Sequence, residues 1–167
     1  QFTGETLDLT ETATGTSNVI INVGSGTTAS FANLTASTFD NGLDTVTING
    51  ADGGNETITG PNIASTIIVG SGDDVIVAGT QNDIIDGGAG DDRLTGGSGN
   101  DRYLFDTNDV ASGERITEAS SGGTDVVAIV TTPDFTDILT SSFDEIEQIE
   151  FAGANQTATA KGVHLSG

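Results

Sequence analysis

The sequence predicts an all-β protein built as a parallel β-solenoid, and three observations support this. Residues 69–104 divide into four consecutive nonapeptides, VGSGDDVIV, AGTQNDIID, GGAGDDRLT and GGSGNDRYL. In every unit, position two is glycine, position six is aspartate and position eight is a large, mostly apolar residue. A glycine-rich half with a single core candidate per unit argues against an amphipathic helix. A flexible linker would not keep aspartate and an apolar residue in the same columns through four units.

Each unit suits a tight turn followed by a short strand. Glycine permits the positive φ of a turn, and the last three residues alternate between inward and outward side chains. Two units make one coil, so coils repeat every 18 residues and pair as parallel strands about 4.8 Å apart. Position six then stacks along each edge of the roll, with Asp74 over Asp92 on one edge and Asp83 over Asp101 on the other. The apolar column consists of Ile76, Ile85, Leu94 and Tyr103.

The stacked carboxylates point to a cation, because they repel one another unless a positive charge lies between them. Aspartate and turn carbonyls are hard oxygen ligands, and calcium accepts about six to eight such oxygens. The chain has no cysteine, and its single histidine, His164, is distant in sequence, so zinc and softer metals lack ligands here. We therefore predict Ca²⁺ as the cofactor.

At these residues the sequence resembles the RTX (repeats-in-toxin, hemolysin-type) calcium-binding family, whose nonapeptide is G-G-x-G-x-D-x-U-x. The last two units match it in full, whereas Val69 and Ala78 replace the first glycine and Gln81 replaces the third. The resemblance covers 36 of 167 residues. It implies a right-handed parallel β-roll with calcium held between successive turns on each edge.

The resemblance also implies the ligands, because family members use position-six carboxylates and turn carbonyls. On one edge these would come from Asp74, Asp92 and the turn Gly88–Gly90, and on the other from Asp83, Asp101 and the turn Gly97–Gly99. The predicted metal-site residues are Asp74, Asp83, Asp92, Asp101, Gly70, Gly72, Gly79, Gly88, Gly90, Gly97 and Gly99. Glu56 and Asp109 are weaker candidates, so we expect two complete sites and up to two more at the ends.

We predict three segments along the chain. Residues 1–50 form a leading β segment rich in Thr, Ser, Asn and Gly, either as further coils without calcium chemistry or as a small sheet. Residues 51–104 form the calcium-binding roll, and residues 105–167 form a C-terminal capping segment. Short bursts of strand-favouring residues occur within the leading segment at 7–9, 18–23, 30–34 and 45–48.

The nine-residue pattern weakens on both sides of the firm repeats. Upstream, Ile58 and Ile67 keep the apolar column, but Glu56 and Ser65 occupy the aspartate column, and we interpret Glu56 as a solvated surface residue. Downstream, Tyr103 and Phe105 are large enough to plug the end of the roll. Residues 124–130 and 146–151 predict strands, with a short helix as the alternative for the second. Such a stretch resembles the RTX capping region, and an open solenoid end needs a cap in any case.

Composition excludes several classes of function. The net charge of −21, from 25 acids and four bases, argues against nucleic acid or an anionic membrane as a partner. No run of about 18 apolar residues predicts a membrane span. No G-x-S-x-G elbow or placed acid–base pair occurs, and His164 reads as a solvated tail residue, so we predict no enzymatic activity.

These observations together predict a calcium-binding structural module. It would belong to a larger secreted or cell-surface bacterial protein of the adhesin or surface-layer (S-layer) type and would stiffen on binding extracellular calcium. The alternative is the export and folding appendage of a type I-secreted exoenzyme or toxin whose catalytic domain lies elsewhere in a longer protein. The threonine-rich leading segment favours the first. Predicted partners are calcium ions, with like modules or cell-surface polysaccharide as further candidates.

Overall fold

The computed structural model describes residues 18–33, 45–106, 109, 113–119, 122–130, 142–151 and 157–158. The elements within these ranges are β-strands, and nearly all of them pair in parallel, which confirms the predicted all-β solenoid. Within the same ranges, no helix has the length and apolar character needed to cross a membrane.

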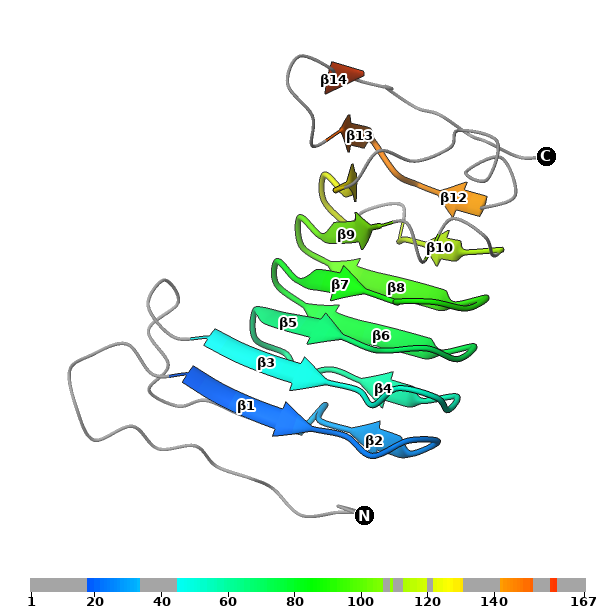
Figure 1. Ribbon diagram of the computed structural model, residues 1–167. Coiled ribbons are helices and arrows are strands. Elements are labelled where there is room, and N and C mark those ends of the chain that lie inside the picture. The colour runs from blue at the N-terminus through cyan, green and yellow to red at the C-terminus, as the bar shows by residue number, and fades with distance from the viewer. Residues whose placement is uncertain are drawn as a thin grey trace.

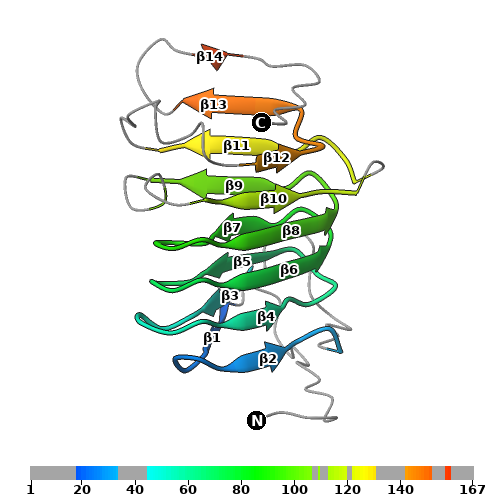
Figure 2. The ribbon, with the colours of Figure 1, turned by 90° about the vertical axis from the view of Figure 1, so that its right-hand side faces the viewer.

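The strands form two sheets that face each other along the length of the roll (Figure 1). The first sheet consists of β1 (Asn18–Asn22), β3 (Thr45–Asn49), β5 (Ser65–Ile68), β7 (Ile84–Asp86), β9 (Arg102–Phe105), β11 (Val126–Ile129), β13 (Gln148–Phe151) and β14 (Thr157–Ala158), in that order. The second sheet consists of β2 (Thr28–Ser30), β4 (Thr57–Thr59), β6 (Val75–Thr80), β8 (Arg93–Ser98), β10 (Arg115–Thr117) and β12 (Ser142–Asp144), in that order. Apart from β14, which pairs antiparallel with β13, successive strands alternate between the sheets, so each coil gives one strand to each (Figure 2).

The predicted 18-residue coil is confirmed within the repeats. Ile76 pairs with Leu94 in the second sheet, and Ile85 pairs with Tyr103 in the first. Beyond the repeats the coils lengthen, because Arg115 pairs with Arg93 after 22 residues and Val126 pairs with Arg102 after 24. The two sheets therefore continue past the end of the nonapeptide pattern.

Three features on either side of the repeats differ from prediction or resolve an alternative. The strand-favouring segments at 18–23 and 45–48 form β1 and β3, which belong to coils of the same roll. Residues 7–9 lie outside the described residues. Tyr103 and Phe105 do not plug the end, because β11 pairs onto β9 and continues the sheet. The alternative of a helix near residue 146 is wrong, since Gln148–Phe151 forms strand β13.

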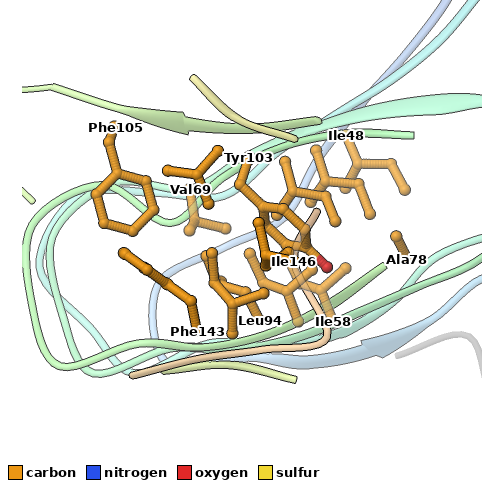
Figure 3. Packing of buried hydrophobic residues seen from close by; sticks show 14 of the residues in the cluster. Ile48, Ile58, Val69, Ala78, Leu94, Tyr103, Phe105, Phe143 and Ile146 are labelled. Atoms are coloured by element: carbon orange, nitrogen blue, oxygen red, sulfur yellow. The ribbon is translucent and has the colours of Figure 1, made fainter. Parts of the chain in front are cut away.

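The core consists of apolar side chains that both sheets contribute to the space between them (Figure 3). The predicted apolar column is buried throughout, at Ile58, Ile67, Ile76, Ile85, Leu94 and Tyr103. At the C-terminal end, Phe105 of the first sheet meets Phe143 of the second edge-to-face, with ring centroids 5.5 Å apart. Aromatic pairs in this geometry add about 0.5–1.5 kcal/mol to the burial of their surfaces.

Adjacent isoleucines in β7 test the inward and outward alternation. Ile85 is 0% exposed and Ile84 is 38% exposed. Ile85→Ala should lower the free energy of unfolding by about 2–5 kcal/mol, because it leaves a cavity in the core. Ile84→Ala should lower it by less than about 1 kcal/mol. Urea unfolding in excess calcium, followed by circular dichroism, measures both; equal losses would contradict the assigned faces.

Candidate metal centres along the two edges of the roll

The turns between the sheets stack into two edges. We call the turns that lead from the first sheet to the second the first edge, and those that return the second edge. On the first edge, the acids immediately before the strands are Glu56, Asp74, Asp92 and Glu114. On the second edge they are Asp83, Asp101, Asp125 and Glu147. Each acid thus lies directly before its strand. The second residue of that strand points its side chain into the core.

The structure brings together the predicted aspartate pairs. Asp74 donates its backbone N–H to Oδ1 of Asp92 at 2.7 Å, and Asp83 does the same to Oδ1 of Asp101 at 2.8 Å. All four side chains are buried. Stacking of position six every 18 residues is therefore what the structure shows.

This ladder of acids extends beyond the four repeats in both directions. Toward the N-terminus, Glu56 donates its N–H to Asp74. Toward the C-terminus, Asp92 donates to Oε1 of Glu114 at 3.4 Å, and Asp101 donates to Oδ1 of Asp125 at 2.8 Å. Each coil is thus held by the acid of the coil that follows it.

Within the described part of the chain, the second carboxylate oxygen of each position-six aspartate has no hydrogen-bond donor. These buried oxygens belong to Asp74, Asp83, Asp92 and Asp101, and Glu56, Asp109 and Glu114 each have one as well. Burying an unpaired charge is strongly unfavourable, so buried carboxylates are normally paired or coordinate a metal. Arg102 with Glu150 is the one salt bridge within the described residues, and it lies at the surface. Among the residues that the structure describes, no cation therefore neutralises these oxygens.

Burial shifts the protonation of these acids. It raises the pKa of Asp74 and of Asp101 to about 6, and that of Asp83 to about 7. For Asp92 and Glu114, burial again raises the pKa, and the repulsion of neighbouring carboxylates raises it further. Burial and carboxylate repulsion both make ionisation of these acids unfavourable. A cation beside the carboxylates would relieve this cost.

The turns place main-chain carbonyls against the next coil. Gly90 has a φ of +151°, and a side chain there would overlap the carbonyl oxygen of Gly72 one coil earlier. Gln81, which replaces a motif glycine, adopts a φ of +76°, and its carbonyl oxygen lies against Gly99. The substituted unit therefore keeps the turn, although a non-glycine residue in this region costs about 1–2 kcal/mol. The predicted turn glycines are positioned as a stack of carbonyl groups on each edge.

Sequence reasoning missed two glycines at position one, Gly87 and Gly96. A Cβ at Gly87 would lie 2.6 Å from the unpartnered Oδ2 of Asp92, and a Cβ at Gly96 would overlap Oδ2 of Asp101. Both glycines therefore keep space open in front of a buried carboxylate oxygen. The signal was present in the sequence, because these are the two units that match the motif in full.

The weaker candidates are both buried. The interpretation of Glu56 as a solvated surface residue is wrong: Glu56 is 1% exposed, and its Oε1 accepts the N–H of Gly26 at 2.6 Å. Asp109 is 2% exposed and accepts the N–H of Asp106. His164 lies outside the described residues.

Three further buried acids, Glu114, Glu118 and Asp125, were not predicted as site residues. Glu114 begins Glu-Arg-Ile-Thr, which parallels the Asp-Arg-Leu-Thr that begins at Asp92, and this similarity was a usable signal. Glu118 differs from the others because it accepts the N–H groups of Gly96 and Gly97 and the hydroxyl of Tyr103. Its carboxylate is therefore satisfied by protein donors.

The donor set fits a hard cation. Within the described residues, no three acidic, histidine or cysteine side chains come close enough to hold a metal by themselves. Main-chain oxygens must therefore complete any site, with position-six carboxylates supplying the charge. Carboxylate and carbonyl oxygens together are the ligands that calcium prefers in proteins.

Comparison with known families agrees with this chemistry. Residues 68–103 match the model of the RTX calcium-binding nonapeptide repeat in four copies, which confirms the resemblance. These repeats bind Ca²⁺, so this part of the chain is a calcium-binding module of a type typical of secreted bacterial proteins. Searches of curated proteins and of solved structures gave no significant match.

The raised pKa values predict a pH dependence of calcium binding. Calcium requires deprotonated carboxylates, whereas the calcium-free fold holds protons on Asp83 up to a pKa of about 7. The calcium-free fold is therefore favoured below the ordinary aspartate pKa and loses stability as pH rises through the raised values. Lowering the pH from about 8 to about 5 should weaken calcium binding by more than about tenfold. Calorimetry in buffers of different ionisation enthalpy should show proton release; binding that is independent of pH would contradict the prediction.

Proposed function

We propose that this chain is a calcium-binding structural module of a larger secreted or cell-surface bacterial protein of the adhesin or surface-layer type, and that it folds and stiffens on binding extracellular calcium. The observation that carries the proposal is the state of the four position-six aspartates. Each is buried, gives one oxygen to the preceding coil and has a second oxygen without a protein partner.

We expect folding to depend on calcium, because the cost of the buried charges is comparable to the net stability of a domain. Domains are stable by only about 5–15 kcal/mol, and an uncompensated buried charge can remove several kcal/mol. Four such aspartates surround a core that is one side chain thick on each sheet. At neutral pH the calcium-free roll should therefore be unstable, and ion binding supplies the missing free energy.

Stiffening follows from the connectivity of the roll. In a solenoid, each coil contacts only its neighbours, so its rigidity depends on the contacts between adjacent coils. An ion held by the aspartate of one coil and the turns beside it adds a link along the axis. Extracellular calcium modules bind at about 0.1–1 mM, which suits a protein that remains unfolded in the cytosol and folds after export.

The surface-protein assignment is supported by the leading segment. Strands β1, β2 and β3 continue the two sheets ahead of the repeats, so the roll extends in that direction. Like modules or cell-surface polysaccharide are the proposed partners. The sequence of the full-length gene tests this assignment: tandem repeats of this module support it, whereas an adjoining catalytic domain would make the module an export and folding appendage of an exoenzyme or toxin.

Chelation tests the dependence of folding on calcium. We expect the β signal in circular dichroism to be lost in a chelator at neutral pH and restored by millimolar calcium. Magnesium should restore it poorly, because Mg²⁺ retains its water and demands a stricter geometry. Unchanged β content without calcium would contradict the proposal, and equal rescue by magnesium would indicate general charge screening.

Neighbouring aspartates provide a matched test of the ligands. Asp92 is buried with an unpartnered oxygen, whereas Asp91 is exposed and accepts the N–H of Gly113 at 2.9 Å. Asp92→Ala should raise the calcium midpoint of folding by about tenfold, equivalent to about 1.4 kcal/mol. Asp91→Ala removes the same charge but should shift the midpoint far less, because water can replace an exposed acceptor. Similar shifts in the two variants would mean that charge density alone drives binding.

A further inference from the structure

Asp92 is the last position-six aspartate of the first edge within the matched repeats, and it meets Glu114 of the following coil on that edge. Glu114 immediately precedes β10, as Asp92 immediately precedes β8, and the two strands are paired. The N–H of Asp92 donates to Oε1 of Glu114 at 3.4 Å, and both side chains are almost completely buried. Glu114 therefore occupies the place that the aspartate of a further repeat would take.

The oxygens not used in this contact lack protein partners. Oδ2 of Asp92 and Oε2 of Glu114 are buried without a hydrogen bond, and so is Oδ1 of nearby Asp109. Arg93 and Arg115 follow the two acids directly, but both are exposed on the outer face of the second sheet. Buried carboxylates that repel each other and have no basic partner are a strong indication of a missing positive charge.

The backbone at Gly87 and the length of the next coil shape the surroundings of these oxygens. Gly87 keeps open the space in front of Oδ2 of Asp92, because a Cβ there would lie 2.6 Å from that oxygen. The coil that ends at Glu114 is 22 residues long instead of 18. Glutamate is one methylene longer than aspartate, which lets its carboxylate reach Asp92 from a coil that does not follow the repeat.

We propose that Asp92 and Glu114 together bind a calcium ion, at a site that lies outside the four nonapeptides. The inference rests on the proposed calcium-dependent function, because Asp92 also belongs to the pair with Asp74. Main-chain oxygens of the turn Gly87–Gly90 complete the ligands, and Asp109 adds negative charge beside them. The calcium-binding sites on the first edge then extend beyond the nonapeptide repeats.

Native mass spectrometry in millimolar calcium tests the site by counting bound ions. Glu114→Gln keeps the shape of the side chain and removes its charge, and it should bind one ion fewer than the unaltered protein. Glu145→Gln makes the same change in charge at an exposed glutamate and should retain the full number. If Glu114→Gln retains every ion, Glu114 only shares a proton with Asp92 and the proposal is wrong.

Two further variants separate the possible failures. Asp83→Asn, on the second edge, should bind one ion fewer whether or not Glu114 is a ligand. If Asp83→Asn loses an ion and Glu114→Gln keeps the full number, only this inference is overturned. An unaltered protein that binds no calcium overturns the proposed function as well. If Glu114→Gln does not fold in millimolar calcium, Glu114→Asp replaces it. That variant keeps the charge but has a shorter reach, so one ion should bind about tenfold more weakly, and an unchanged calcium titration would overturn the proposal.

Discussion

The structure depends on one repeated interaction, in which a buried carboxylate immediately before each strand from β6 to β11 accepts a backbone N–H of the coil before it. This contact aligns successive turns, and it places a second carboxylate oxygen where the protein supplies no partner. Core packing and metal chemistry are thus linked through one residue on each edge of a coil.

Regular spacing explains how much could be predicted from the sequence. Ile76, Ile85 and Leu94 recur in one column, so their burial and the stacking of Asp74 over Asp92 follow from period and pleat alone. Glu56 was placed correctly in the column but assigned to the surface, because propensity cannot show that Gly26 comes close enough to donate to it.

The remaining acids were missed because the coil length changes. Glu114 lies 22 residues after Asp92 and Asp125 lies 24 after Asp101, so neither falls in a nine-residue column. Sheet pairing restores the alignment, since β10 and β11 stay in register with β8 and β9. A search for an acid followed by an alternating triplet, without fixed spacing, would have found Glu114, which precedes Arg-Ile-Thr, but not Asp125, which precedes the wholly apolar Val-Val-Ala.

The direction of the acid ladder gives the roll a polarity. Each backbone N–H in the ladder is accepted by a carboxylate that comes later in the chain: Asp74 relies on Asp92, and Asp92 relies on Glu114. Trimming coils from the N-terminal side leaves every remaining donor with its acceptor. Trimming from the C-terminal side strips the acceptor from the coil that becomes last. The ladder therefore keeps its hydrogen bonds when N-terminal coils are removed, and it loses acceptors when C-terminal coils are removed. A nascent chain cannot complete its ladder until its last coils have been synthesised.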